Sequence, residues 1–281
     1  MKQNDLSKKL KGAMGFDVYY GELYKNRWEG LKSALLLKPD YAEYNVKGKE
    51  SYFLDTGSVR AALALPLKGA KNILDMCAAP GGKTIVLASC MDADATLISN
   101  ERSPERKNRL AHSVENCLPE YIKNRVITIC KDGAKLCLSE SNRFDRILLD
   151  APCSSERHVL TDEKYLKEWS PSRIKTIAVS QWALLSSAYR MLNPDGYLVY
   201  STCALDPIEN DMIVSKLIKK FDDVEILDPV ISSDCSEFTN AVLPEGEKNL
   251  YGYHILPDVQ NGAGPLYFSL IHKKNNLLYK S

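Results

Sequence analysis

The sequence has little of what would attach the chain to a membrane or to nucleic acid by charge alone. It contains no apolar run near the ~18 residues needed to cross a bilayer, and residues 1–17 lack the apolar core of a secretory signal. The 37 Lys and Arg nearly balance the 36 Asp and Glu, which leaves a net charge of +1. Composition therefore gives no electrostatic argument for a nucleic-acid partner. We expect no membrane partner and a cytoplasmic protein, or a mitochondrial one if the chain is eukaryotic.

The eight cysteines also lack the spacing of a metal site. No two of them form a C-x-x-C pair, and no histidine stands near them at ligand spacing. We therefore expect no bound metal. In a reducing compartment most of these residues should be small buried apolar side chains, so a functional role has to be argued for each cysteine separately.

The pattern of apolar residues predicts an α/β fold. From about residue 71 onward, short β-branched runs alternate with helix-like segments, which is typical of a parallel sheet covered by helices. Strands are expected over 72–77, 95–100, 125–130, 144–150 and 196–202, and a closing antiparallel strand at or near the sheet edge over 266–272. Helices are expected over 83–91, 103–118, 170–192 and 207–221. Residues 71–281 should form one large domain, preceded by a small element over 1–70 with a helix at 23–37 and a strand or turn at 52–54.

A turn of small residues follows the first expected strand. Residues 78–82 read Ala-Ala-Pro-Gly-Gly and are followed by Lys83 and Thr84, so a ligand can approach the backbone closely. The Gly-Gly-Lys-Thr run also resembles the end of a phosphate-binding loop. That loop needs glycine at position 77, where Cys77 stands, so the NTPase alternative is disfavoured.

Acidic residues stand at the ends of three successive strands. Glu101 could accept hydrogen bonds from a ribose diol, Asp132 could receive an exocyclic amine, and Asp150 could face an ammonium group or a base edge. One such acid is more often a helix cap or a solvated turn residue. Because the carboxyl ends of parallel strands line a common crevice, three together favour a shared pocket.

Two cysteines also stand at strand ends, Cys153 after the fourth strand and Cys203 after the fifth. Adjacent parallel strands would bring both thiols into one cleft. Carbon 5 of cytosine cannot attack a sulfonium methyl group until a nucleophile adds to carbon 6, and a thiol suits that addition. Lys83 is the available cation to ionise the thiol, and Asp150 could support positive character at N3 of the ring. The second thiol could assist the later release of the first thiol from the methylated base.

Three motifs stand together in this chain: D-x-C-A-A-P-G-G-K-T at 75–84, D-x-P-C-S at 150–154 and T-C at 202–203. With them the sequence resembles the NSUN family of RNA cytosine-5 methyltransferases, and the similarity runs from residues 16–20 to residues 264–265. The resemblance implies a Rossmann-like class I methyltransferase fold, with a mainly parallel twisted sheet, helices on both faces and a small N-terminal helical extension that contacts RNA.

The resemblance also implies site residues, a cofactor and a substrate. Cys203 would be the covalent nucleophile and Cys153 would help free the product, with Asp150 and Lys83 as further catalytic residues. The cofactor would be S-adenosyl-L-methionine. Its expected contacts are Cys77, Ala78, Ala79, Pro80, Gly81, Gly82, Lys83, Glu101, Arg106, Asp132, Gly133 and Asp150. Ribosomal RNA is the preferred substrate and transfer RNA the alternative. The chain would act as a monomer, unless a protein partner delivers the RNA.

Residues 155–158, Ser-Glu-Arg-His, resemble the branch that contains mitochondrial ribosomal and transfer RNA enzymes. Three alternatives stay open. A DNA cytosine-5 enzyme would use Cys153 as the attacker, an amine methyltransferase would carry an N-P-P-Y-like segment in place of 151–154, and a noncatalytic RNA-binding or assembly protein could retain the scaffold. His158 and His254 are assigned no role, because isolated histidines are more often structural.

Overall fold

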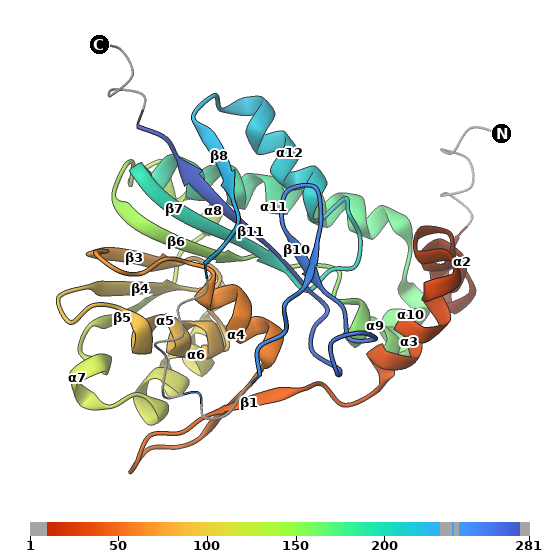
Figure 1. Ribbon diagram of the computed structural model, residues 1–281, viewed down its shortest axis with the longest axis horizontal. Coiled ribbons are helices and arrows are strands. Elements are labelled where there is room, and N and C mark those ends of the chain that lie inside the picture. Colours follow the sequence, from red (N-terminus) through yellow and green to blue (C-terminus); the bar gives the residue numbers. More distant parts are fainter. Residues whose placement is uncertain (1–9, 231–237, 239–241, 276–281) are drawn as a thin grey trace.

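One central sheet organises the part of the chain that the computed structural model describes, residues 10–230, 238 and 242–275 (Figure 1). Within these residues nine strands belong to it. In spatial order they are β5 (Val126–Ile129), β4 (Thr96–Asn100), β3 (Asn72–Asp75), β6 (Phe144–Asp150), β7 (Leu192–Thr202), β11 (Leu266–Lys273), β10 (Tyr253–Ile255) and β9 (Glu247–Lys248), with β8 (Val224–Leu227) also paired to β11. The strands from β5 to β7 are parallel, as the alternating sequence pattern predicts.

Helices cover both faces of the sheet, because successive strand residues point to opposite sides. Ile73 packs with the layer formed by α4 (Thr56–Leu63), α5 (Gly82–Cys90), α6 (Pro104–Cys117) and α7 (Glu120–Lys123). Its neighbour Leu74 packs with α8 (Gly133–Leu136), α11 (Pro171–Met191) and α12 (Asp211–Lys220). The expected Rossmann-like, mainly parallel architecture is therefore confirmed.

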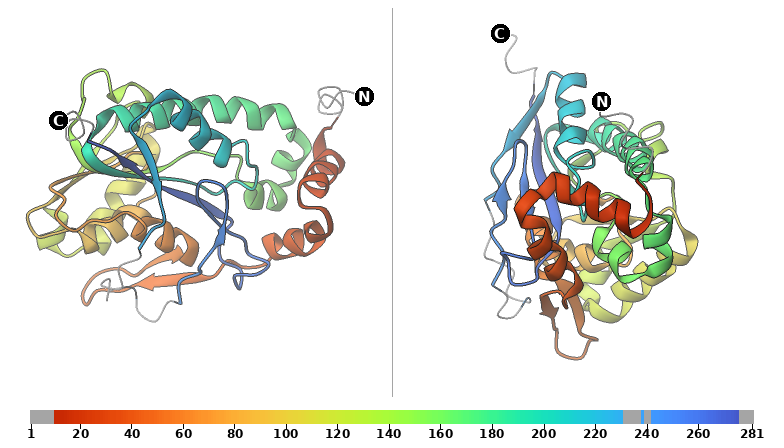
Figure 2. Two further views of the ribbon diagram at one scale, coloured as in Figure 1. Left: turned by 45° about the horizontal axis from the view of Figure 1, so that its top comes forward. Right: turned by 90° about the vertical axis from the view of Figure 1, so that its right-hand side faces the viewer.

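Helices α2 (Gly12–Tyr24) and α3 (Trp28–Leu36), joined by the short 3-10 helix η1 (Lys25–Arg27), lie at one end of these layers (Figure 2). Their apolar side chains form a third cluster with those of α9 (Glu156–Thr161) and α10 (Glu163–Glu168). Trp169 is fully buried there among the rings of Phe16 and Tyr20. A hairpin follows, β1 (Tyr41–Tyr44) paired with β2 (Tyr52–Asp55). The N-terminal segment therefore covers the loops that follow the central strands.

Helix starts follow local chemistry at one predicted position and depart from it at another. Ser103 caps α6 by accepting a hydrogen bond from the Arg106 amide, with Pro104 as the first helical residue. At α11 the helix begins at Pro171 as expected, but Ser170 makes no capping bond and its hydroxyl contacts Ser172 instead.

Several predicted boundaries were wrong. The helix expected over 23–37 is interrupted, because Lys25 has a positive φ of 52° and ends α2, so that the chain turns and brings Trp28 back against Phe16. The helix expected from 207 begins at Asp211, since residues 207–210 form a turn. β7 begins four residues early, at Leu192. β11 is antiparallel as expected but is an interior strand, because β10 and β8 pair beyond it.

The order of the strands creates one crevice. The chain proceeds from β3 outward to β4 and β5, and then returns to place β6 and β7 on the other side of β3. Ligands in open α/β sheets bind beyond the carboxyl ends of the strands at such a reversal. The residues that follow β3, β4, β6 and β7 are therefore the ones to inspect.

Candidate active site

The two strand-end cysteines meet. Residues Asp150 and Ser201 lie opposite each other on β6 and β7, so the turns that follow them are neighbours. Cys153 Sγ lies 2.7 Å from Cys203 Sγ, and both thiols are free. Each side chain is only partly buried. The prediction that adjacent strands bring the two thiols together is confirmed, but each thiol lines a cavity of its own.

The turn that carries Cys203 is held by its neighbours. Thr202 donates its hydroxyl to Asn210 Oδ1 at 2.6 Å and accepts from the Ala204 amide. The Asn210 amide group then donates to the Ala204 carbonyl. These residues are buried, so the bonds are protected from water and fix the direction in which Cys203 leaves the strand.

Two buried carboxyl groups hold the loop that carries Cys153. Glu156 accepts hydrogen bonds from the Ser154 hydroxyl, from the Tyr20 hydroxyl at 2.5 Å and from the Leu205 amide at 2.9 Å. It therefore joins the Cys153 loop, the turn after Cys203 and helix α2. Burial raises the pKa of Glu156, and the hydrogen bonds from Ser154, Tyr20 and Leu205 only partly oppose that rise.

Glu209, in the turn at residues 207–210, holds the same loop that carries Cys153. One of its oxygens accepts from the Ser154 amide at 3.0 Å and from the Gln181 amide group at 2.9 Å. Its other oxygen is buried and has no hydrogen-bond partner in the described part of the chain. Burial, and then the charge of Glu156, raise the pKa of Glu209 to about 8. Glu209 is thus largely protonated near neutral pH.

An ion pair lies beside the thiols. Lys83 Nζ donates to Asp150 Oδ2 at 2.8 Å and to the Ser58 hydroxyl at 3.1 Å, while the Ser201 hydroxyl donates to Asp150 Oδ1. Burial by itself lowers the pKa of Lys83, but the charge and hydrogen bond of Asp150, with a smaller contribution from Cys203, raise it overall. Lys83 is therefore a fixed positive charge near both Asp150 and Cys203.

A cavity of about 520 Å³ opens on Cys203, and we call it the Cys203 pocket. Its lining residues come from all parts of the chain. They are Leu35, Leu37, Pro39, Tyr41, Asp55, Ser58, Lys83, Asp150, Ser155, Arg157, His158, Thr161, Cys203, Gly264, Pro265 and Leu266. A volume of this size lies within the range of small-molecule sites.

Arg157 ties the walls of the Cys203 pocket together. Its guanidinium donates to the carbonyls of Leu35, at the end of α3, and of Leu37, just after it. It also donates to the carbonyls of Gly262 and Gly264, which precede β11. Five donors in a planar fork allow one side chain to hold both segments. Asp55 completes the closure by accepting from the Gly264 amide. The loop at 256–265 thus contributes to this pocket.

A second cavity, of about 590 Å³, opens on Cys153, and we call it the Cys153 pocket. Among the predicted cofactor residues it is lined by Cys77, Glu101, Arg106, Asp132 and Gly133. Asn100, which the sequence did not single out, also lines it and bonds to the chain after β3 and after β5 through Met76 and Lys131. This pocket is the crevice at the reversal of strand order.

The two carboxylates of the Cys153 pocket, Glu101 and Asp132, differ in the hydrogen bonds that they accept. Glu101 accepts from the Ser103 amide through Oε1 and forms an ion pair of 3.2 Å with Arg106 through Oε2. Oε2 is buried and accepts no hydrogen bond from any described residue. Asp132 caps α8 by accepting from Ala134, which is the ordinary role expected for a strand-end acid, and it lines the pocket as well.

The loop between β3 and α5 lies beside the two cavities. Gly81 has a φ of 120°, which side-chain-bearing residues rarely adopt, and a Cβ there would lie 2.9 Å from Ser113. Lys83 and Asp150, predicted as cofactor contacts as well as catalytic residues, line the Cys203 pocket and not the Cys153 pocket. Residues 78–82 line neither cavity. Their contact with a cofactor stays a prediction.

Sequence reasoning missed the residues that support the site. Glu156 and Arg157 were noticed only as part of a branch resemblance, and Glu209 and Gln181 were not noticed. Their signal was weak, since a single Glu or Gln in a polar stretch usually lies on the surface. His158 lines the Cys203 pocket. His254 is buried away from both thiol pockets, and burial lowers its pKa to about 4.

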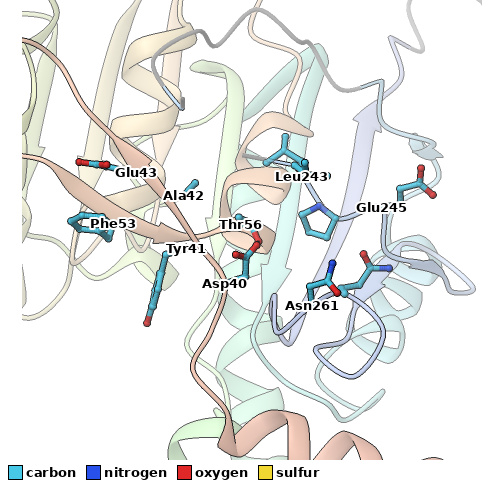
Figure 3. A pocket seen from close by; sticks show the side chains of 12 residues that line it. Asp40, Tyr41, Ala42, Glu43, Phe53, Thr56, Leu243, Glu245 and Asn261 are labelled. Carbon is cyan, nitrogen blue, oxygen red and sulfur yellow. The ribbon is translucent and has the colours of Figure 1, made fainter. Parts of the chain in front are cut away.

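A third cavity, of about 800 Å³, adjoins the Cys203 pocket, and we call it the outer pocket (Figure 3). Figure 3 shows Tyr41 and Phe53 of the hairpin on one side of it, with Glu245 and Asn261 on the other. Tyr41 lines both this cavity and the Cys203 pocket, and it is 47% exposed. Tyr41 therefore stands at the boundary between the two.

Within residues 10–230, 238 and 242–275, no group of three or more His, Cys, Asp or Glu is placed to hold a metal ion, and no helix is long and apolar enough to cross a membrane.

Comparison with known proteins gives matches over most of the chain. The family described as "16S rRNA methyltransferase RsmB/F" matches residues 62–270. The chain is 38% identical over 168 residues to the tRNA (cytosine(49)-C(5))-methyltransferase of Pyrococcus abyssi, covering 60% of this chain and 52% of that protein. It is 31% identical over 227 residues to the 5-cytosine rRNA methyltransferase NSUN4 of Bos taurus, covering 77% of this chain and 58% of that protein. The chain thus spans less than two thirds of the length of either relative.

The fold also matches a solved structure. A methyltransferase homolog protein from Pyrococcus horikoshii superposes with a TM-score of 0.69 at 22% identity, covering 97% of this chain and all of that one. At this identity the likeness establishes the fold, and the residues of the site have to be argued from their own geometry.

Proposed function

The chain belongs to the RsmB/F family of 16S rRNA methyltransferases, and on that premise we propose that it transfers a methyl group from S-adenosyl-L-methionine to carbon 5 of a cytosine in RNA. The observation that carries the proposal is the contact of 2.7 Å between Cys153 and Cys203, with one cavity opening on each thiol. A reaction that needs both a nucleophile and a second proton-transferring group explains why two free thiols meet there.

The Cys153 pocket fits the cofactor. A ribose diol needs a buried acceptor, and Glu101 Oε2 accepts no hydrogen bond from the described protein. Asp132 can receive an adenine amine, and Cys77 and Gly133 complete the crevice. S-adenosylmethionine, when bound, supplies an electrophilic methyl group.

The Cys203 pocket fits the target base. Cys203, as thiolate, adds to carbon 6 of the cytosine, which makes carbon 5 nucleophilic. Asp150 holds the edge of the ring that carries N3 and stabilises the positive character that develops there, and Lys83 fixes the position of Asp150. After methylation the proton on carbon 5 passes to solvent, its bonding pair re-forms the double bond between carbons 5 and 6, and the bond between sulfur and carbon 6 breaks with its electron pair returning to Cys203. Cys153 assists that release.

Cys203 is the better candidate for the attacking thiol. It lines the pocket that contains Asp150 and Lys83, whereas Cys153 lines the cofactor side. The hydrogen bond to Cys203, and then burial, raise the pKa of Cys153 well above its ordinary value. The raised pKa makes Cys153 a poor thiolate nucleophile, which disfavours the arrangement of DNA cytosine-5 enzymes.

The substrate we propose is ribosomal RNA, because the matching family is described by that substrate. Transfer RNA is the second candidate, because the Pyrococcus abyssi relative is named for it. The target cytosine must leave its stack to enter a cavity of about 520 Å³. Tyr41, at the boundary of the outer pocket, is placed to stack on a flanking nucleotide. The N-terminal element over 1–70 would then contact RNA.

We further propose a cytoplasmic location, or a mitochondrial one in a eukaryote. A monomeric enzyme, assisted by an RNA-delivering protein if one is needed, stays the expectation from the resemblance. A noncatalytic scaffold is the remaining alternative, and the complete set of thiols, acids and lysine argues against it.

The test is methyl transfer in vitro. The purified chain is incubated with isotopically methyl-labelled S-adenosylmethionine and with ribosomal RNA or transfer RNA from cells that lack the gene, and bisulfite sequencing then locates the modified cytosine. We expect one protected cytosine, in ribosomal RNA. A protected cytosine in transfer RNA would show that transfer RNA is the substrate and would leave the proposed reaction unchanged. If no labelled methyl group entered either RNA, the proposal would be overturned.

A further inference from the structure

Ser155 places a hydroxyl group against both sulfur atoms. Its Oγ lies 3.3 Å from Cys203 Sγ and 3.5 Å from Cys153 Sγ. The same hydroxyl can also donate to the Cys153 carbonyl at 3.4 Å. Within the described residues, two side chains lie within hydrogen-bond distance of Cys203 Sγ. They are those of Ser155 and Cys153.

The backbone at Ser155 is unusual for a serine. Its φ of 57° and ψ of 60° lie in the left-handed region, where glycine is the least strained residue. A strained conformation persists only where the surroundings enforce it. Here the enforcing contacts are the bonds of Ser154 to Glu156 and Glu209. The strained turn directs the hydroxyl at the thiols, which a glycine in the same turn could not do.

A hydroxyl at this position suits a thiolate. When Cys203 is ionised, its sulfur can accept hydrogen bonds from the Cys153 thiol and from the Ser155 hydroxyl, and bonds to a charged acceptor are the strong ones. When the sulfur is bonded to carbon 6 it loses this charge, and the hydroxyl can turn to the Cys153 carbonyl. As the bond to carbon 6 breaks, the electron pair returns to sulfur and the hydroxyl can donate to it again.

We propose that the Ser155 hydroxyl is a further catalytic group that donates a hydrogen bond to the Cys203 thiolate and stabilises it both before attack and during release. The assignment rests on the proposed function for the role of Cys203. The hydrogen bond itself is a property of the free protein.

Other charged and titratable groups face Cys203, and a test of the Ser155 hydroxyl must leave them unchanged. They are Lys83 on α5, Asp150 at the end of β6, Cys153, Asp55 before α4, Arg157 and His158 on α9, and Tyr41 on β1. Replacing Ser155 leaves all of them in place. A difference between variants at this position therefore reports on the hydroxyl or on the strained turn.

Two variants separate those two effects. Ser155→Gly removes the hydroxyl and relieves the left-handed strain, and Ser155→Ala removes the hydroxyl while it keeps the strain. The exposed Ser172→Ala is the matched control. Alkylation of the folded proteins by iodoacetamide is followed from pH 5.5 to pH 10 without RNA or cofactor. Trypsin then separates peptide 147–157, with Cys153, from peptide 191–216, with Cys203.

We expect the pH midpoint of Cys203 alkylation to rise by about one unit in both Ser155 variants, so that alkylation below the midpoint becomes about tenfold slower. The control should keep the original midpoint. A midpoint unchanged in both variants, or shifted in only one of them, would overturn the inference, because only the hydroxyl is lost in common. Failure of the wild-type chain to methylate RNA would instead overturn the proposed function, since alkylation needs neither RNA nor cofactor.

Discussion

The Cys153 pocket and the Cys203 pocket meet at one pair of sulfur atoms but are built in different ways. The Cys153 pocket is lined by residues between positions 76 and 184, which follow consecutive strands or lie on α11. The Cys203 pocket draws on residues from position 35 to position 266. The first is a consequence of the sheet, and the second exists only when both ends of the chain fold over it.

This difference separates the general part of the site from the specific part. A crevice at the carboxyl ends of parallel strands is what the fold provides for a cofactor. The closure by Arg157, which binds the end of α3 and the segment before β11, adds a second cavity, which we propose for the substrate ring. Changes in the two pockets should therefore affect cofactor binding and base chemistry separately.

The largest expected effect is on the Cys203 side. Cys203→Ala should lower methyl transfer at least about a thousandfold, because the nucleophile is removed, and should leave the affinity for S-adenosylmethionine unchanged. Single-turnover methyl transfer and calorimetric cofactor binding measure the two quantities. Cys130→Ala, a free and exposed cysteine outside both pockets, is the control. Full activity of Cys203→Ala would end the assignment.

Cys153→Ala should lower turnover about a hundredfold by slowing release. Because Cys203 can still attack, the RNA should remain covalently bound to the protein and survive denaturation, and gel electrophoresis would reveal the adduct. If the adduct formed with Cys203→Ala and not with Cys153→Ala, the roles of the two thiols would be reversed.

Replacing Glu101 in the Cys153 pocket should have the opposite effect, on cofactor binding and not on the chemistry at the base. Glu101→Gln should weaken S-adenosylmethionine binding about 10- to 100-fold, since the ribose loses a charged acceptor, and should leave RNA binding intact. Calorimetry for the cofactor and filter binding for RNA distinguish the two. Glu105 is an exposed acid in the first turn of α6, and Glu105→Gln should bind both ligands normally. Unchanged cofactor affinity in Glu101→Gln would remove Glu101 from the cofactor site.

Tyr41→Ala should raise the KM for RNA about tenfold with little change in kcat, because one stacked base loses its partner while the thiols are untouched. Tyr41→Phe keeps the ring and should behave as the wild type. Steady-state kinetics with RNA as the varied substrate measures this. A fall in kcat at constant KM would show that Tyr41 acts on the reacting base and not on a flanking one.

The smallest expected effect is on stability and concerns Glu209, which holds the loop that carries Cys153 between the two pockets. Below pH 4.5, Glu209 is protonated in the folded and the unfolded chain. Between pH 4.5 and about 8 only the unfolded chain ionises it, so the free energy of unfolding falls as the pH rises, by at most about 1.4 kcal/mol per unit. Above about pH 8 the loss is complete.

Glu209→Gln removes this dependence and keeps an oxygen for Ser154 and Gln181. The variant should therefore gain Tm over the wild type, by a few degrees, as the pH rises from 5 to 8. The exposed Glu29→Gln should show no such trend. A difference in Tm that is constant across this range would contradict the raised pKa.

The elements nearest the sheet were predictable from the sequence because their patterns are local. Alternating β-branched runs identified all five parallel strands, and Ser103-Pro104 identified the start of α6. The turn between α2 and α3 was missed, since the apolar spacing around Trp28 suits one helix, and the burial of Phe16 and Tyr20 against Trp169 decides the break. Pairing beyond β11 was missed because short strands such as β9 carry almost no periodic signal.

The sequence by itself determined the chemistry of this protein: two thiols, three strand-end acids and one lysine, each placed by a strand that must end where its apolar run ends. The tertiary structure alone decided the supports, because Glu156, Glu209 and Arg157 gain their partners from segments 40 or more residues away. It also decided where the Ser155 hydroxyl points. Buried polar groups must find partners wherever the fold supplies them, and no local pattern in the sequence records which partners those will be.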